Sequence, residues 1–474
     1  MDKIEFSEDI NEALKDQVEK DVVVNGLHEA HIHLIEGVLG VDDLKVVAQK
    51  VGVELDDKSW EFIGGIMGEK NPAKDLPSFI GKLCTPGVRI IEIAKIRQEM
   101  ARAGGEINPE QLVRVQKDVL IAVEQTALDK LDKSGVTSVE GFASPHALTG
   151  DGDLSDLKYL YNQKTDNGLP LSLTELKSFW DESSSKLKEA GALMSLEDYF
   201  EALDEGRKKL GWKLLDKDFK TGDIKNRYVS WRACLRRERK EGAKIGDKFG
   251  LQVPELSDVY RLIHLYERGL LAGVDLAGNE GDAKTMAEVY RPVFAVLKEN
   301  HVRTSNHAGE KKLGNTINAD FEIGLNNITT AIDFGVDRIG HGTFLLYAYQ
   351  NHDNQDLSED VRKDLAELCN KGDEFFAKGG MLEICLTSNQ LTNVAEIKNH
   401  PVFAALKKRP DLISHILICT DDPAVAGDKT NLFIEELVNF CMYSGLPVKE
   451  TLVKLRSNAD KTVFRHTGIV DNFS

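Results

Sequence analysis

The chain has 474 residues, of which 60 are Lys or Arg and 78 are Asp or Glu, so its formal net charge is −18. Such an excess of negative charge argues against a nucleic-acid backbone or an anionic membrane as the main partner, because both repel a polyanion. Hydrophobic residues make up 41% of the chain and charged residues 29%, the balance of a folded globular protein rather than a disordered one.

The cysteine pattern and the first residues predict a compartment. The chain has six cysteines, and none shows the C-x-x-C spacing of zinc ribbons or thioredoxin-like sites. Several lie in apolar runs such as 383–386 and 416–419, which favours buried free thiols in a reducing environment. Segment 1–9 is acidic and lacks the apolar stretch of a secretory signal, and no apolar run approaches the roughly 18 residues of a membrane-spanning helix. We therefore predict a cytoplasmic protein with no membrane partner.

Short apolar runs recur along the chain, and each is followed by polar residues or glycine. Runs of this kind are typical of buried parallel strands. We predict eight strands, in segments 22–34, 135–142, 228–235, 271–278, 301–307, 336–341, 381–386 and 416–421.

Helical patterns lie between these strands. In 282–299 apolar residues recur at spacings of three and four, and a second helix is predicted over 357–371. The last six strand signals are about 30–45 residues apart, the size of a βαβ unit. Eight strands alternating with helices predict an α/β protein, a single (β/α)₈ barrel domain over 1–474.

Two connections are too long for one helix, namely 38–134 and about 150–222. The second contains two helical patterns, over 172–189 and 196–211, and we predict that it forms an inserted helical subdomain. A lid or an oligomer contact are its functional interpretations, and passive decoration is the alternative. A basic stretch follows at 232–248, for which we predict a solvated helix, with a phosphate-recognising patch as the alternative.

The predicted strand ends carry ionisable residues, and barrel active sites form where the strands end. His31 and His33 are two residues apart, so on a strand both imidazoles project from one face and can bind one metal. His307 ends the fifth strand, His341 the sixth, and the pair Asp421–Asp422 the eighth. Three histidines and one carboxylate suit zinc, with water in an open position. Zinc lowers the pKa of that water to about 7.

Taken together, these motifs resemble the adenosine deaminase family of the metal-dependent amidohydrolases. The resemblance covers most of the chain, and His-Ala-Gly-Glu and Asp-Asp-Pro are its most specific motifs. It rests on the segments 31–34, 139–140, 144–146, 275–280, 307–310, 340–342, 388–389 and 420–423. The fold that it implies is the same (β/α)₈ barrel.

The resemblance implies a role for each residue of the site. It implies that one zinc ion per chain is bound by four ligands: His31, His33, His307 and Asp421. Glu310 would protonate purine N1, which requires a raised pKa. His341 would orient the attacking hydroxide and stabilise its charge, and Asp422 would move protons to the departing amine. The Gly278 backbone N–H would meet purine N3.

One departure concerns the sugar. Family members usually follow the H-x-H motif with Leu-Asp-Gly, whose Asp engages the ribose 5′-hydroxyl, whereas this chain has Leu34-Ile35-Glu36-Gly37. Either a local bulge lets Glu36 replace that Asp, or sugar recognition differs. Two further motifs, 388–390 and 399–401, also occur in longer, secreted growth-factor members. We interpret both motifs as barrel structure.

The sequence thus predicts hydrolytic deamination of a small-molecule purine nucleoside, adenosine or 2′-deoxyadenosine, to inosine and ammonia. AMP is an alternative, with Arg232 or Arg236 at the phosphate; adenine and N6-substituted or 5′-modified adenosines are others. A non-catalytic purine-binding or growth-factor-like protein is the alternative from another class. A two-metal amidohydrolase would need a Lys at the fourth strand end, where the chain has 275–278 with none. The small zinc deaminases need P-C-x-x-C, which is also missing.

Overall fold

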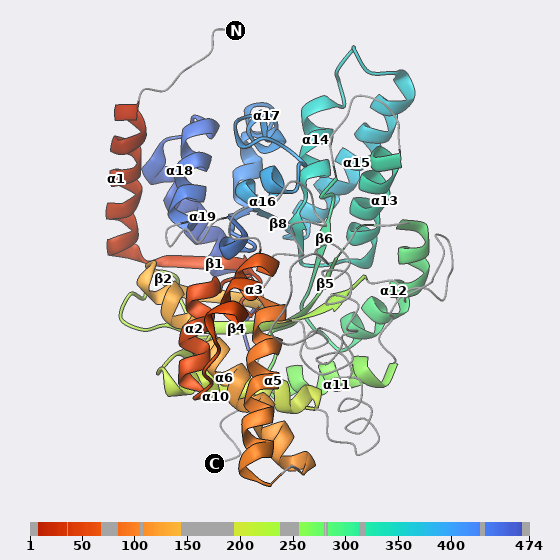
Figure 1. Cartoon of the computed structure of the whole chain (residues 1–474). Helices are drawn as coiled ribbons and strands as arrows, with labels where there is room; N and C mark the ends of the chain where they lie inside the picture. The colour runs from red at the N-terminus through yellow and green to blue at the C-terminus, as the bar shows by residue number, and fades with distance from the viewer. Residues whose placement is uncertain are drawn as a thin grey trace.

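A closed parallel barrel forms the centre of the protein (Figure 1). The computed structural model describes residues 8–35, 37–67, 84–104, 108–143, 194–237, 256–278, 280, 283–311, 319–426 and 432–466. Within these residues, eight strands pair in parallel, each with the next along the chain. They are β1 (Leu27–Ile32), β2 (Val136–Ala143), β4 (Tyr228–Arg236), β5 (Gly273–Ala277), β6 (Thr304–Ala308), β7 (Arg338–His341), β8 (Met381–Ile384) and β9 (Ile416–Ile418).

The barrel closes between β1 and the end of β9. Ile32 and Asp421 form a parallel bridge, in which the Asp421 N–H donates to the His31 carbonyl at 3.0 Å and the His33 N–H donates to the Asp421 carbonyl at 3.1 Å. A two-residue strand, β3 (Lys213–Leu214), pairs with the start of β4 outside this order. The predicted (β/α)₈ barrel is confirmed.

Helices surround the barrel and cover its strands (Figure 1). Their described members are α1 (Glu8–Asn25), α2 (Val41–Lys50), α3 (Asp57–Met67), α5 (Thr85–Arg102), α6 (Pro109–Lys133), α10 (Leu196–Lys209), α11 (Leu256–Glu267), α12 (Ala283–Glu299), α13 (Ala319–Phe334), α14 (Thr343–Asn351), α15 (Glu359–Ala377), α16 (Leu386–Leu391), α17 (Pro401–Lys408), α18 (Leu432–Ser444) and α19 (Val448–Thr462). Three short 3₁₀ helices, η1 (Ile397–Asn399), η2 (Pro410–His415) and η3 (Pro423–Ala426), complete the set. No helix in this part of the chain is long and apolar enough to span a bilayer.

The prediction was wrong at the start of the first strand. Residues 22–24 form the last turn of α1, where Val23 and Val24 are exposed, and β1 begins only at Leu27. Gly26 separates the two elements: its φ is +68°, and its N–H donates to the Val22 carbonyl at 2.7 Å. A glycine in this left-handed conformation is a common helix end, so the three valines belong to a helix rather than a strand.

The long connections are mostly helical where the structure describes them, and the second also contains β3. The first contains α2, α3, α5 and α6, and α6 begins with a capping box between Asn108 and Gln111. In the second, α10 matches the predicted helix over 196–211 and packs against α6. Residues 144–193 lie outside the described part of the chain. The inserted subdomain and the single-domain boundary therefore stay predictions. The six cysteines are free and buried, as predicted.

A carboxyl group is buried beside the barrel, and none of the described residues forms an ion pair with it. Glu124 of α6 is fully buried, and its Oε1 accepts a hydrogen bond from Trp231 Nε1 at 3.1 Å. Burial raises the pKa of Glu124 to about 8. In an unfolded chain the pKa of this group is close to 4.5. Between these two pKa values, Glu124 is therefore protonated in the folded protein and ionised in the unfolded chain.

We expect the Glu124→Gln variant to flatten the pH dependence of stability. Between pH 5 and pH 8 the wild-type group removes roughly 1.4 kcal/mol of unfolding free energy per pH unit, because only the folded state stays protonated. A neutral amide has no such dependence. Urea unfolding at several pH values measures it, with Glu61→Gln on the exposed side of α3 as control. Identical slopes for wild type and Glu124→Gln would contradict the prediction.

Candidate metal centre and active site

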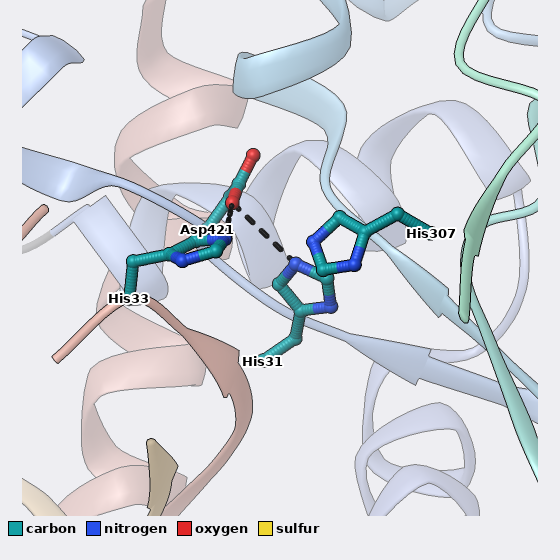
Figure 2. A group of neighbouring side chains, drawn as sticks. All are labelled: His31, His33, His307 and Asp421. Atoms are coloured by element: carbon teal, nitrogen blue, oxygen red, sulfur yellow. Dashed lines mark ion pairs between the residues drawn. The ribbon is translucent and has the colours of Figure 1, made fainter. Parts of the chain in front are cut away.

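The four predicted ligands lie together where the strands end. One ligand atom from each of His31, His33, His307 and Asp421 lies within 4.8 Å of all the others. Figure 2 shows the rings of His31 and His33 facing Asp421, whose Oδ1 is 3.4 Å from Nε2 of both. His31 lies on β1 and His307 on β6, while His33 and Asp421 follow β1 and β9. Closure of the barrel therefore brings together ligands that are far apart in the sequence.

The histidine rings are oriented as metal ligands require. Nδ1 of His31 lies 2.7 Å from Glu383, and Nδ1 of His307 lies 2.8 Å from Asp275. Both Nε2 atoms are buried, and neither makes a hydrogen bond to the described residues. Carboxylates behind the histidines are the usual outer shell of a metal site. An N₃O set with two unsatisfied imidazole nitrogens fits a divalent cation such as zinc.

The electrostatics of the cluster favour a bound cation. Burial lowers the pKa of His33 to about 3 and that of His307 below its usual value, so both rings are neutral and can coordinate. Burial opposes the charge of Asp421, but the neighbouring His31 holds the Asp421 pKa well below its usual range. The same contact and Glu383 raise the pKa of His31 despite burial. A metal held by His31 would therefore displace a proton from this ring.

Glu310 and His341, two of the predicted catalytic residues, lie beside this cluster. His341 Nε2 is 3.7 Å from Glu310 Oε2 and 3.9 Å from Asp421 Oδ2. Burial raises the pKa of Glu310 to about 8, with the negative charges of Asp421 and Glu280 adding to the rise. Glu310 is therefore largely protonated at neutral pH. Burial also lowers the pKa of His341 to about 4, so that ring is neutral.

Three predicted site residues remain: Asp422, Gly278 and Glu36. The structure describes the first two but not Glu36. Asp422 is buried against the loop that follows His33: a Cβ added to Gly37 would lie 1.7 Å from Asp422 Oδ1, so only glycine fits there. Gly278 follows β5 with φ +96°, and a Cβ on it would lie 3.2 Å from the Arg237 backbone nitrogen. Glu36 lies outside the described residues, so its part in sugar recognition stays a prediction.

The short helix α16 contacts three residues of the site. Ser388 Oγ donates to Asp421 Oδ2 at 2.6 Å, and Thr392 Oγ1, directly after the helix, donates to Glu310 Oε1 at 3.0 Å. Asn389 Nδ2 lies 3.0 Å from His341 Nδ1. Segment 388–390 forms part of α16, and its side chains also contact the site. The signal that could have identified this segment is a polar triplet four to six residues after the end of a buried strand.

Two buried glutamates hold the backbone around the ligands. Glu280 accepts hydrogen bonds from the N–H groups of Gly309 at 3.0 Å and Glu310 at 2.6 Å, which fixes the turn after His307. Glu29 accepts from the His31 N–H at 3.0 Å and from Thr420 Oγ1 at 2.8 Å, which joins β1 to β9 beside two ligands. The sequence analysis assigned neither residue a role.

Arg232 lies within the barrel, not on a basic surface. It is fully buried, and its Nη1 donates to Glu383 Oε1 at 2.9 Å and to Ser305 Oγ at 3.0 Å. Ser305 in turn donates to Asp275 at 2.6 Å, so one guanidinium connects the carboxylates behind His31 and His307.

These contacts correct two expectations about the basic stretch. β4 continues through Arg236, so 232–236 is strand rather than solvated helix, and residues 238–255 lie outside the described part of the chain. The buried Arg232 is committed to carboxylates and cannot serve a substrate phosphate. The side chain of Arg236 lies outside the described part of the chain. The ion pair between Arg232 and Glu383 lies in the interior of the barrel.

We expect the Arg232→Met variant to lose stability and to bind metal more weakly. Removing one partner of a buried ion pair typically costs about 3–5 kcal/mol, because the other charge stays buried. Glu383 would keep only its pair with Arg338 and would hold His31 less firmly. Thermal melts and chelator competition measure both effects. The matched control is Arg268→Met, which breaks an exposed pair with Glu201 worth at most about 1 kcal/mol. Equal losses in the two variants would contradict the prediction.

Solved structures of known proteins share this fold. The chain is 16% identical to the adenine deaminase of Arthrobacter aurescens, with a TM-score of 0.51 over 93% of this chain and 94% of that one. It is also 16% identical to an amidohydrolase of Burkholderia ambifaria with bound zinc, with a TM-score of 0.52 over 98% of this chain and 90% of that one. At this identity the likeness shows the fold alone, a (β/α)₈ barrel.

A protein-family model also matches part of the chain. Residues 251–466 match the model described as adenosine deaminase, a segment that contains His307, Glu310, His341 and Asp421. No curated protein matches the chain. The resemblance seen in the sequence is therefore confirmed for this segment, which is similar to the adenosine deaminases over somewhat less than half of the chain. His31 and His33 precede the matched segment, and the barrel brings them to it.

Proposed function

We propose that the protein is a zinc-dependent hydrolase that deaminates adenosine and 2′-deoxyadenosine to inosine and ammonia. The observation that carries this proposal is the pairing of a buried metal-ligand cluster with Glu310, a carboxylic acid that stays protonated at neutral pH. Hydrolysis of an aromatic amine needs an activated water, a proton donor to the ring and a proton carrier to the leaving group. The site holds one candidate for each.

One zinc ion would be held by His31, His33, His307 and Asp421. When bound, it supplies a water whose pKa is lowered to about 7, and so a nucleophile at neutral pH. The chain positions the ligands through Glu383 and Asp275, which keep the Nε2 atoms of His31 and His307 directed into the cluster.

Glu310 would donate its proton to purine N1. Protonation of N1 withdraws electrons from C6 and makes this carbon more electrophilic. The raised pKa follows from burial and from the nearby carboxylates of Asp421 and Glu280, and it keeps the acid loaded before the reaction. Thr392 Oγ1 donates to Glu310 Oε1, which leaves Oε2 as the oxygen that faces His341 and the centre of the site.

His341 and Asp422 would act on the attacking and leaving groups. The neutral His341 ring faces Glu310 and Asp421 and would orient the attacking oxygen as charge develops on it. Asp422 would accept a proton from that oxygen and pass it to the departing amine. The Gly278 N–H would hold purine N3, and Glu36 would take the ribose 5′-hydroxyl.

An ultraviolet assay of purified, zinc-loaded protein tests the proposal. The panel is adenosine, 2′-deoxyadenosine, AMP, adenine, 5′-methylthioadenosine and N6-methyladenosine, with ammonia release as a second measurement. We expect adenosine and 2′-deoxyadenosine to be converted fastest. Turnover of another purine alone would keep the mechanism and move the difference to the sugar pocket. Silence across the panel with zinc bound would overturn the proposal.

A further inference from the structure

Two motifs meet behind His341, on the side away from the metal ligands. Asn389 belongs to α16, and His400 is the N-cap residue of α17. Asn389 Nδ2 lies 3.0 Å from His341 Nδ1, and Asn389 Oδ1 lies 3.1 Å from His400 Nε2. All three side chains are at most 1% exposed. They therefore form a buried chain of hydrogen bonds that ends on a candidate catalytic residue.

The direction of this chain is fixed at its outer end. The backbone N–H of Val402 donates to His400 Nδ1 at 3.3 Å, and a backbone N–H can only donate. His400 Nδ1 therefore carries no proton. Burial lowers the pKa of His400 to about 3, so the ring is neutral and its one proton is on Nε2.

The proton on His400 then orients the amide of Asn389. An Nε2–H at 3.1 Å requires an acceptor, so the amide oxygen faces His400 and the amide nitrogen faces His341. Thr343 Oγ1 reinforces this orientation, because it donates to the same Oδ1 at 3.1 Å. The amide nitrogen can only donate, so His341 Nδ1 must accept.

We propose that His400 and Asn389 are positioning residues that set the tautomer of His341, so that this ring presents an Nε2–H to the active site. The Nε2 atom faces Glu310 Oε2 at 3.7 Å and Asp421 Oδ2 at 3.9 Å, distances too long for a direct hydrogen bond. In this tautomer His341 acts as a hydrogen-bond donor to an oxygen in the site. It does not act there as the base that removes a proton.

In this proposal the motifs 388–390 and 399–401 act together to set the tautomer of His341, a role that the sequence alone did not indicate. α17 starts at Pro401, which supplies no N–H, so Val402 provides the first free backbone donor of the helix. The helix start thus determines the proton position on a ring in the active site. The effect on turnover rests on the proposed function, whereas the protonation state of His341 does not.

Nitrogen-15 NMR of protein with labelled histidine rings tests the proposal directly. The metal-loaded wild type is compared with Asn389→Asp, His400→Leu and His400→Gln, and His341→Gln assigns the His341 signals. We expect Nδ1 of His341 to be unprotonated in the wild type and protonated in Asn389→Asp, because a carboxylate can only accept. We expect turnover to fall about 10- to 100-fold in Asn389→Asp and His400→Leu. His400→Gln, whose amide can still donate, is expected to retain most of it.

Other outcomes separate the two proposals. A proton on His341 Nδ1 in the wild type would overturn the inference, whatever the activity. Wild-type signals and turnover in His400→Leu would overturn the role of His400. The NMR spectra could show the expected tautomers while the protein converts none of the purines. That result would support this inference and overturn the proposed function. If Asn389→Asp does not fold, the two His400 variants still decide.

Discussion

Replacing Glu310 with Gln is expected to leave the metal bound and to lower kcat by about two to four orders of magnitude, the usual contribution of a general acid. The amide has nearly the same shape and can still accept the hydrogen bond from Thr392. It cannot deliver a proton to N1, because an amide is not an acid at neutral pH. Metal content and steady-state kinetics on the same preparation measure the two effects separately.

The matched control for this variant is Glu322→Gln, on an exposed position of α13. It removes the same charge without touching the site, so metal content and kcat are expected to stay at wild-type values. Substantial turnover in Glu310→Gln with full metal content would contradict the assignment of Glu310 as proton donor. Loss of metal from Glu310→Gln would instead make this residue part of the metal site.

Replacing His31 with Ala is expected to remove stoichiometric metal and, with it, activity. His31 is fully buried, and its ring is held between Glu383 on one side and the ligand cluster on the other. The variant removes a ligand outright. We therefore expect metal affinity to fall by more than the 10- to 100-fold that loss of an outer-shell partner costs. Metal analysis after dialysis against a weak chelator measures this.

The control for His31→Ala is His352→Ala, a half-buried histidine at the end of α14 whose Nδ1 contacts only the Ala348 carbonyl among the described residues. We expect it to keep its metal. Retained stoichiometric metal in His31→Ala would remove His31 from the ligand set. A protein that melts normally but binds no metal would support the assignment, since the fold then stands without the ion.

The barrel could be predicted from the sequence because each buried parallel strand leaves a local mark. All eight predicted segments overlap the observed strands. Only the start of the first segment is wrong: 22–24 is apolar and β-branched but is ended by Gly26, and the turn geometry shows that it closes a helix. The sequence of the long connections does not predict their structure in the same way. Several helices can fill such a connection, and they can be arranged in more than one order.

The candidate ligands could be predicted because they follow the strand ends, where a barrel collects functional side chains. The residues that support them could not. Glu383 lies in the apolar run 381–386, and its partners Arg232 and Arg338 come from strands far away in the sequence. A charged residue within a buried strand must find a partner or a hydrogen bond. This rule predicts that Glu383 has a partner, but it does not predict which residue that is.

Basic residues were the weakest part of the prediction. β4 is buried along its described length, Arg232 included, although the charges that follow it suggest a solvated face. Its two carboxylate contacts come from β8 and, through Ser305, from β5. Only the closed barrel brings these three strands within reach of one guanidinium, so no pattern in the local sequence distinguishes this arginine from a surface one.

The most direct test of the account is a metal titration of the metal-free protein. Zinc is added in fractions of one equivalent while the conversion of adenosine, or of the purine that the panel selects, is followed by absorbance. We expect activity to rise linearly and to stop at one zinc per chain, since His31, His33, His307 and Asp421 form a single site. Activity without metal, or a break at two equivalents, would contradict it.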